Sequence, residues 1–412
     1  MSGCELGLDH VRINGMPDLI KTLAARAPSI GALTRGVSAA DQVSRGYGHT
    51  LQEICRQPEA WQAIASRLPD CILPSVESSD GLLLVGSGSS HFIGVALAPT
   101  LQVSLKRPVR AVSAGEILLS PEAYVNVERC PTIVSFGRSG DSPESIAVAD
   151  LIFKRWPQCE QVFVTCNPVG RLAKAYESAP KILTIVLGSD VNDQSLVMTS
   201  SFTSLWLAGR GLGVRASDSA VPAIASSLAE MGRGLLLEHS DRLAEVAGRS
   251  FDHAVFLGSG PRFGAALEAE LKMLEMCAGR VTTDAESYLG LRHGPMAGLT
   301  NQSLLVAFIS TNSRRRAYEL DLLKEVQQKE LGLCVVYCGS NLPSEIKDSD
   351  ARLTVEYGVS SLLGDDDLVA IDVLVGQMLG FFRCLHEGLK PDAPSETGVI
   401  DRVVPSFPTY SS

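Results

Sequence analysis

Short apolar runs alternate with longer amphipathic segments along most of the chain, beginning near residue 82. In the first half the apolar runs have strand length, and they cover residues 82–85, 109–112, 132–136, 161–165 and 182–186. The segments between them carry apolar residues at helical spacing, most clearly at residues 92–105, 142–154 and 170–175. This alternation predicts a parallel sheet with helices on both faces, and a ligand site beyond the carboxyl ends of the strands.

A second set of strands and helices follows the same plan. Its strands are predicted at residues 254–257, 304–310, 333–338 and 353–355, and its helices at residues 263–277 and 316–329. The first strand of each set runs into the same kind of loop, Gly86-Ser87-Gly88 in the first and Gly258-Ser259-Gly260 in the second. The sequence therefore predicts an α/β protein with two tandem copies of one flavodoxin-like unit.

The residues before the first copy have no clear strand pattern. Residues 42–55 and 59–67 are predicted as helices, so this part is expected to be a helical extension that packs on the first copy. The predicted organisation is an N-terminal extension, two α/β domains and a tail, at residues 1–78, 79–235, 236–390 and 391–412.

A loop rich in glycine and serine follows the third strand of the first copy. It reads Ser139-Gly140-Asp141-Ser142 and leads into a predicted helix. Glycine lets the backbone approach a ligand, hydroxyls donate hydrogen bonds, and the first N–H groups of the helix favour an anion. This pattern indicates a phosphate site. It is equally typical of a capped turn, with Ser142 as N-cap and Pro143 as the first helical residue.

The second copy has no glycine at the corresponding place, where Thr311-Asn312-Ser313-Arg314-Arg315 stands. One phosphate site per chain is therefore expected. The Gly-Ser-Gly loops lack the third glycine of a dinucleotide fingerprint, and no acidic residue follows at the spacing that a ribose needs. No nicotinamide cofactor is expected.

Charge and cysteine content narrow the class of protein. A net charge of −10 argues against a nucleic-acid partner, and the basic cluster Arg314-Arg315-Arg316 is expected in a solvated loop or beside an anionic ligand. No apolar stretch reaches the roughly 20 residues that span a membrane, and no secretory leader pattern is visible. The ten cysteines form no Cys-x-x-Cys pair, so reduced, buried thiols in a cytoplasmic protein are expected, without zinc.

Two further segments carry candidate chemistry. Lys272 and Glu275 are three residues apart on a predicted helix and share one face, where they form either a surface ion pair or part of a site. His293 stands before Gly294-Pro295, which predicts a turn rather than a continuing helix. Histidine suits proton transfer near neutral pH, although a histidine on a turn is more often structural.

These features together resemble the sugar isomerase (SIS) domain fold, with the isomerase half of glucosamine-6-phosphate synthase as the mechanistic reference. A closer resemblance is to the tagatose-6-phosphate ketose/aldose isomerase family, also described as galactosamine-6-phosphate deaminase/isomerase. That resemblance spans nearly the whole chain from about residue 44. It rests on His49-Thr50, Glu53-Ile54, Gln57-Pro58, residues 139–145, Met198-Thr199-Ser200-Ser201-Phe202-Thr203, Leu291-Arg292-His293-Gly294-Pro295, Tyr318, Leu320-Asp321-Leu322-Leu323 and Lys390-Pro391-Asp392.

The resemblance implies a role for each matching residue. The sugar phosphate would be held by the hydroxyls of Ser90, Ser139 and Ser142 with the backbone of Arg138. The sugar itself would be held by Ser89, Thr199 and Ser200. Glu275 would move the proton between C1 and C2, with Lys272 near the sugar hydroxyls. His293 would open the ring in the neighbouring subunit's site, which implies a homodimer with shared sites. No metal and no cofactor is implied.

The chain also departs from the reference enzyme. A tail lysine that closes over the open-chain sugar there is matched here by Val399, with Lys390 and Arg402 only nearby. Residues 1–78 are too few for the glutamine-hydrolysing domain of that enzyme, so nitrogen transfer from glutamine is not expected.

The expected function is an aldose–ketose isomerase or deaminase acting on a hexose or hexosamine 6-phosphate, with galactosamine 6-phosphate converted to tagatose 6-phosphate and ammonia as the specific hypothesis. The alternative is a regulatory protein that binds a sugar phosphate without turning it over. Such regulators commonly carry a nucleic-acid- or partner-binding segment. No basic helix-turn-helix pattern is visible in residues 1–78, and Glu275 with His293 favours the enzyme.

Overall fold

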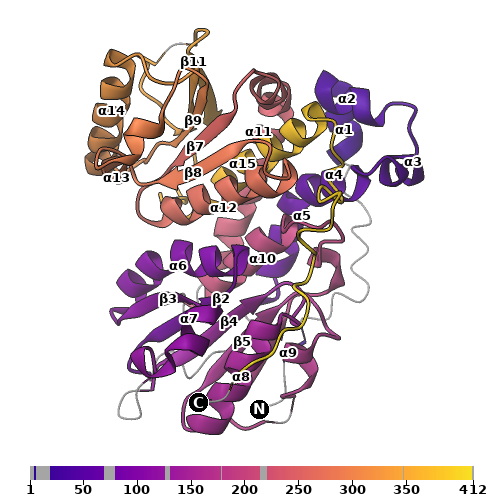
Figure 1. Ribbon diagram of the computed structural model, residues 1–412, viewed down its shortest axis with the longest axis vertical. Helices are drawn as coiled ribbons and strands as arrows, with labels where there is room; N and C mark the ends of the chain where they lie inside the picture. The colour runs from indigo at the N-terminus through magenta and orange to yellow at the C-terminus, as the bar shows by residue number, and fades with distance from the viewer. Residues whose placement is uncertain are drawn as a thin grey trace.

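The computed structural model describes residues 4–5, 19–68, 79–125, 130–177, 179–213, 220–346 and 348–410. Its two sheets form two stacked halves, the first below and the second above in Figure 1, with helices packed between them. The predicted fold class, two tandem α/β units with parallel sheets, is confirmed.

The first sheet has the strand order β1-β6-β5-β4-β2-β3, and all of its pairs are parallel. All five strands predicted for the first half are present. The strands are β1 Cys4–Glu5, β2 Leu82–Gly86, β3 Val109–Ser113, β4 Thr132–Gly137, β5 Gln161–Thr165 and β6 Ile182–Val186. The expectation of no strand before residue 78 is wrong, because β1 pairs with β6. Two residues are too few to give an alternating pattern.

The second sheet has the order β11-β10-β9-β7-β8 and is also parallel. Its strands are β7 His253–Leu257, β8 Thr282–Glu286, β9 Ser303–Phe308, β10 Cys334–Ser340 and β11 Arg352–Tyr357. The sequence did not predict β8. This strand lies at the edge of the sheet and reads Thr-Thr-Asp-Ala-Glu, so it lacks the apolar run by which the others were recognised.

Helices cover both sheets and fill the space between the halves. They are α6 Ser89–Leu105, α7 Ala114–Leu119, α8 Pro143–Arg155, α9 Arg171–Lys174, α10 Ser200–Gly211, α11 Ala220–Ala247, α12 Pro261–Met276, α13 Tyr288–Leu291, α14 Ser313–Gln328 and α15 Val369–His386. The sequence analysis missed α10, α11 and α15. The division placed between residues 235 and 236 falls inside α11, which runs from the first half to the second.

The N-terminal extension is helical, as predicted, but it contacts both halves. Its helices are α1 Leu19–Arg26, α2 Pro28–Thr34, α3 Ala39–Ser44, α4 Gly48–Cys55 and α5 Gln57–Ala65. The single helix predicted at residues 42–55 is split into α3 and α4, and Gly46 between them has a φ of +83°. Helix α5 packs on α10 and α11, whereas α4 packs on α15.

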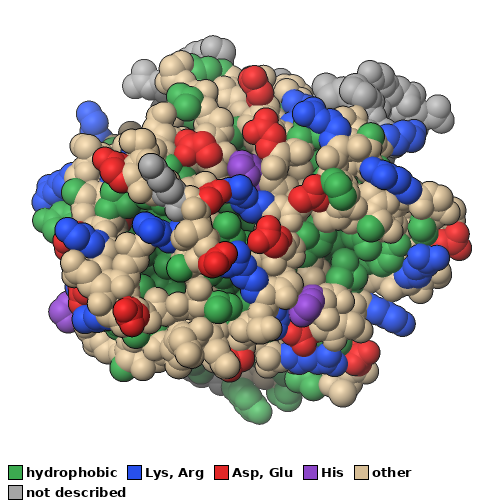
Figure 2. Space-filling model, turned by 90° about the horizontal axis from the view of Figure 1, so that it is seen from above, with side chains coloured by type: hydrophobic (Ala, Val, Ile, Leu, Met, Phe, Trp, Pro, Cys, Tyr) green, Lys and Arg blue, Asp and Glu red, His purple; other side chains and the backbone are tan. Residues whose placement is uncertain are grey.

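Among the described helices, α15 alone is long and apolar enough to cross a membrane by length and composition. Most of it is buried in the protein, where it packs on α11 and α12. The apolar composition of α15 is therefore explained by its place in the hydrophobic core that the two halves share. On the face shown in Figure 2, acidic and basic side chains are interspersed, and no broad basic area covers it.

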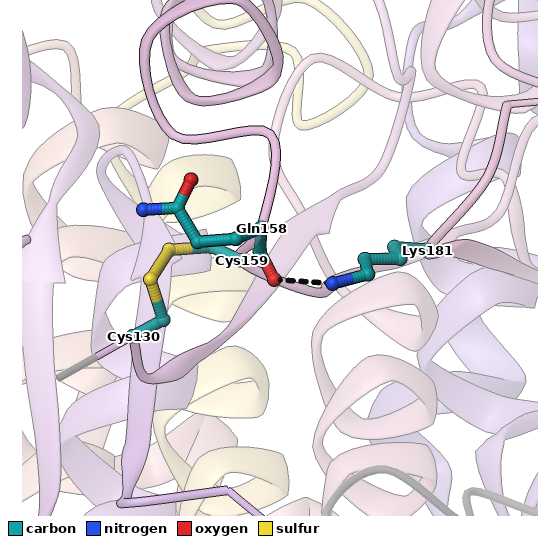
Figure 3. Close-up of a disulfide and its surroundings, with 4 residues drawn as sticks. All are labelled: Cys130, Gln158, Cys159 and Lys181. Carbon is teal, nitrogen blue, oxygen red and sulfur yellow. Dashed lines mark hydrogen bonds between the residues drawn. A yellow bond between two sulfur atoms is a disulfide. The ribbon is translucent and has the colours of Figure 1, made fainter. Parts of the chain in front are cut away.

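One prediction about the cysteines is wrong. Cys130 and Cys159 form a disulfide, with their Cα atoms 5.1 Å apart (Figure 3). Cys130 precedes β4 and Cys159 precedes β5, and the parallel pairing of these strands brings the two thiols together. Cys71 lies outside the described residues. Six described cysteines are buried thiols outside this disulfide, as expected: Cys55, Cys166, Cys277, Cys334, Cys338 and Cys384.

The two halves meet most closely where α6 and α12 cross. At Gly264 on α12 an added Cβ would lie 2.6 Å from the Cβ and the backbone nitrogen of Ala96 on α6. Only glycine allows this approach, because real Cβ atoms do not come so near to other atoms.

Gly264→Ala is therefore expected to lower the stability by about 1–3 kcal/mol through overpacking at this crossing. Urea unfolding followed by circular dichroism measures the change. The matched control is Gly234→Ala on α11, where nothing lies within 4 Å, and a gain of about 0.5–1 kcal/mol is expected there. Equal effects of the two substitutions would contradict the close crossing.

Candidate active site

A cavity of about 180 Å³ opens between the carboxyl ends of the first sheet's strands and α12 of the second half. Its walls come from the loops after β2 and β4, the first turn of α8, the segment before α10, helix α12, and the C-terminal tail. The lining residues used below are Ser89, Ser90, Arg138, Ser139, Ser142, Leu196, Met198, Glu275, Ile400, Asp401, Arg402 and Val404. Parts of the chain that are far apart in sequence thus share one site.

The predicted anion loop forms one wall of this cavity. Ser139 and Ser142 line it, and Gly140 between them has a φ of +68°, a conformation that favours glycine. Pro143 is the first residue of α8, as predicted. The Ser142 side chain makes no capping hydrogen bond with that helix, so its hydroxyl is not used as an N-cap. Ser142 is thus the N-cap residue of α8 by position, as predicted, while its hydroxyl lies at the cavity without a capping bond.

The side chain of Arg138 is bound to the protein itself. One guanidinium nitrogen donates to the carbonyl oxygens of Ser195 (3.3 Å), Leu196 (3.0 Å) and Val197 (3.0 Å), and the other donates to that of Arg402 (2.5 Å). Burial lowers the pKa of this guanidinium, and the charge of Arg402 adds to the effect. The Arg138 side chain thus joins the anion loop to two neighbouring segments, while its backbone stays beside Ser139.

Lys272 and Glu275 lie on the side of α12 that faces the first half. Lys272 Nζ is 2.5 Å from Oε2 of Glu275 and 3.3 Å from Oε1 of Glu268, and it donates to Oγ of Ser89 at 3.1 Å. Lys272 is fully buried, whereas Glu275 is 22% exposed and lines the cavity. The alternative of a surface ion pair is therefore wrong.

Glu268 was not singled out by the sequence analysis. It is fully buried, and desolvation raises its pKa to about 7 even though Lys272 lies beside it. Burial lowers the pKa of Lys272, but Glu268 and Glu275 outweigh that effect and the net shift is upward. The lysine is therefore held charged between two carboxylates. The spacing 268, 272, 275 on one helix face was a signal that could have identified Glu268.

Thr199 and Ser200, the predicted sugar-binding residues, do not line this cavity. Both are fully buried and bind Asp193: the Thr199 N–H donates to Oδ2 at 2.7 Å, and the Ser200 hydroxyl donates to Oδ1 at 2.5 Å. Their loop reaches the cavity through Leu196 and Met198 instead. Alignment of hydroxyl residues could not reveal that a buried carboxylate binds them.

His293 is exposed on a turn and does not line the cavity of its own chain. The turn forms as predicted, because α13 ends at Leu291, Gly294 has a φ of +139°, and a short 3₁₀ turn follows at Pro295–Gly298. Arg292 beside it is bound to Asp321 at 2.8 Å and to Glu325 at 2.7 Å.

The tail passes along the first half, as the yellow segment of Figure 1 shows, and it closes one side of the cavity. Val399 is 82% exposed and points away, whereas Asp401 and Arg402 line the cavity. Arg402 donates through Nε to the carbonyl oxygen of Asp193 at 2.9 Å and through another nitrogen to Oδ1 of Asn192 at 2.8 Å. Asp401 is a cavity residue that the sequence analysis did not identify.

In the second copy an internal carboxylate occupies the loop that corresponds to the anion loop. Asp365 accepts hydrogen bonds from the Ser310 hydroxyl (2.5 Å), the Thr311 N–H (2.9 Å) and the Arg315 guanidinium (2.9 Å). This loop is thus filled by the chain itself. The basic cluster is also partly bound within the chain, since Arg316 donates to the carbonyl oxygens of Ser310, Ser340 and Asn341. Within the described ranges, no three His, Cys, Asp or Glu side chains are grouped as a metal site requires.

Comparison with known proteins gives relatives along most of the chain. No family model matches it. A Streptomyces coelicolor protein, provisionally named D-galactosamine-6-phosphate deaminase AgaS, is 33% identical over 88% of this chain and 95% of its own length. The D-galactosamine-6-phosphate deaminase AgaS of Escherichia coli O157:H7 is 30% identical over 86% of this chain and 94% of its own.

A solved structure from Clostridium novyi has the same fold. It is provisionally described as a tagatose-6-phosphate ketose/aldose isomerase, and it superposes with a TM-score of 0.82 at 27% identity over 90% of this chain and 96% of its own. The likeness therefore extends over most of the chain. The chain belongs to the AgaS family of sugar-phosphate deaminases and isomerases, within the SIS fold.

Proposed function

We propose that this protein converts galactosamine 6-phosphate to tagatose 6-phosphate and ammonia, by an aldose–ketose isomerisation of the amino sugar. The names of its relatives support this substrate. The observation that carries the proposal is the cavity itself, in which the Ser139–Ser142 loop of one half faces Glu275 of the other. A phosphate ester at one end and a proton-moving carboxylate at the other are what the reaction needs.

In the proposed reaction Ser90, Ser139 and Ser142 hold the phosphate with the backbone N–H groups of the loop. These are neutral donors at the N-terminus of α8, and such a set binds a dianion well. The ester would then fix the sugar chain so that C1 and C2 lie near Glu275. Ser89 is 3.1 Å from Lys272 Nζ and would help to position that side of the sugar.

Glu275 would act on the open-chain aldose. Its carboxylate removes the C2 proton, giving a 1,2-enolamine, and returns the proton to C1. The product of this transfer is an imine at C2, to which water adds before ammonia leaves, so that the ketose remains. Lys272 donates to Oε2 of Glu275 and would keep the carboxylate oriented. The same proton transfer without an amino group is plain isomerisation.

His293 would open the sugar ring in the site of a neighbouring subunit, so we propose a homodimer with shared sites. His293 is exposed and does not line the cavity of its own chain, which supports a role outside its own protomer. We also propose a cytoplasmic location, because a phosphorylated sugar carries a charge that prevents passage through a bilayer. A regulatory protein that only binds the sugar remains the alternative, and the position of Glu275 in the cavity favours the enzyme.

Glu275→Gln is expected to abolish turnover while leaving the affinity for the sugar phosphate nearly unchanged, because an amide cannot take the proton. The assay measures ammonia and ketose across a panel of hexose and hexosamine 6-phosphates. The control is Glu270→Gln on the same helix. The carboxylate of Glu270 accepts a hydrogen bond from Thr283 and does not line the cavity. Unchanged turnover by Glu275→Gln would contradict the proposed role of Glu275 as the base. A wild-type protein that binds these sugars without product would establish the regulatory alternative.

Ser139→Ala is expected to weaken binding of the sugar phosphate by about 1.5–3 kcal/mol, because it removes a hydrogen bond to a charged group. Isothermal titration calorimetry measures this loss. The unphosphorylated sugar serves as the control ligand and should bind equally to both proteins. An equal loss for that sugar would show that the loop has another role.

Mixing inactive Glu275→Gln chains with inactive His293→Ala chains is expected to restore part of the activity if the histidine acts across subunits. A mixed dimer then contains one site with both groups intact. Each variant refolded alone gives the baseline. If mixtures show no activity above that baseline, the site is self-contained.

A further inference from the structure

Glu53 belongs to the sequence motif at residues 49–58, which the proposed reaction does not use. It lies on α4 of the N-terminal extension and is only 2% exposed. Its Oε1 accepts the backbone N–H groups of Gln194 at 2.5 Å and Ser195 at 3.3 Å, and its Oε2 accepts the Ser195 hydroxyl. The carboxylate thus holds a loop of the first half, from outside that half.

This loop is the one that receives Arg138. The carbonyl oxygens of Ser195, Leu196 and Val197, directly after the N–H groups bound by Glu53, accept the Arg138 guanidinium. Arg138 stands next to Ser139 in the anion loop. Hydrogen bonds thus connect Glu53 to the segment 194–197, and the same segment to Arg138, the residue that precedes Ser139.

The same loop holds the tail. Arg402 donates to the carbonyl oxygen of Asp193, and Arg138 donates in turn to that of Arg402. At the start of α4, Asp392 of the tail accepts the N–H of Thr50 at 2.7 Å and that of His49 at 3.2 Å. The extension is therefore bound both to the loop that supports the cavity and to the tail that closes it.

The charges around Glu53 make its carboxylate costly to bury. Desolvation raises its pKa, and the carboxylate of Asp193 adds to this, while Ser195, Gln194 and Arg56 oppose it. A buried acid near another acid is maintained only where its hydrogen bonds are needed. Here those bonds go to the loop that supports Arg138.

We propose that Glu53 is a positioning residue for phosphate binding: by fixing residues 194–197 it holds Arg138, and through Arg138 it sets the anion loop and the tail. The inference rests on the proposed function for the phosphate site at residues 139–142, and not on the reaction that follows binding. It deepens that function by assigning a role to the N-terminal extension, which otherwise has no part in the site.

Glu53→Gln is expected to weaken the binding of inorganic phosphate about tenfold, because the amide NH2 cannot accept a hydrogen bond and would face either the Ser195 hydroxyl or the N–H groups of Gln194 and Ser195. KM for the sugar phosphate should rise by a similar factor, while kcat changes less than about threefold, since Glu275 is untouched. Glu53→Asp should recover part of the loss. Calorimetry of the full-length protein with phosphate measures the first effect, and steady-state kinetics the second.

The matched control is Glu59→Gln on α5, whose carboxylate is 3.0 Å from Arg233 and 11% exposed but does not contact the loop. It should bind phosphate as the wild type does. If Glu53→Gln fails to fold, Ser195→Ala removes the hydroxyl partner of the same carboxylate and should weaken phosphate binding in the same direction. Unchanged phosphate binding by Glu53→Gln, or an equal loss in Glu59→Gln, would overturn the inference. Phosphate affinity needs no turnover, so these results stand apart from failure of the proposed reaction.

Discussion

Lys272 carries its ammonium group into the contact between α6 and α12, where no water reaches it. A buried charge of this kind is stable only with partners, and the partners here are Glu268, Glu275 and Ser89. Two of them come from α12 itself and one from α6, so the ion group fixes how the second half sits on the first. That contact places Glu275 at the edge of the cavity, and the close approach of Gly264 to α6 allows it.

The two ends of the cavity use charge differently. The anion end presents hydroxyls and N–H groups, while the nearby guanidinium of Arg138 is bound to four carbonyl oxygens. An arginine used in this way stiffens the wall without binding a ligand directly. Neutral donors at a helix N-terminus hold a phosphate without placing a mobile cation between the ester and the carboxylate of Glu275. The carboxylate of Glu275 is thus paired with Lys272 and not with a cation of the anion end.

Most strands of the two sheets could be predicted from the sequence, because a strand that is buried on both faces is a continuous apolar run. It missed β8, which is polar, and β1, which has two residues. The site was predicted where chemistry is local: the 139–142 loop and Glu275 do meet in one cavity. Thr199 and Ser200 do not join them, since the buried carboxylate of Asp193, which precedes them in the same loop, binds both. Which polar groups bind one another in the interior depends on how the loop folds. The spacing of apolar residues in the sequence carries no information about it.

The two copies use corresponding loops differently: one is bound within the chain and the other lines the cavity. Gly86 and Gly258 keep the same constraint, since an added Cβ would lie 2.4 Å and 2.3 Å from the carbonyl oxygens of Ser90 and Arg262. The Gly-Ser-Gly loops of the two copies are thus alike. The loops that correspond to residues 139–142 differ, because in the second copy Asp365 supplies an anion from within the chain to Ser310 and Thr311. Hydrogen-bond donors that are clustered in a turn need acceptors. Because the carboxylate of Asp365 is part of the chain, it leaves no place at this turn for an anionic ligand. In the first copy the hydroxyls face the cavity instead, so the second half was free to contribute Glu275.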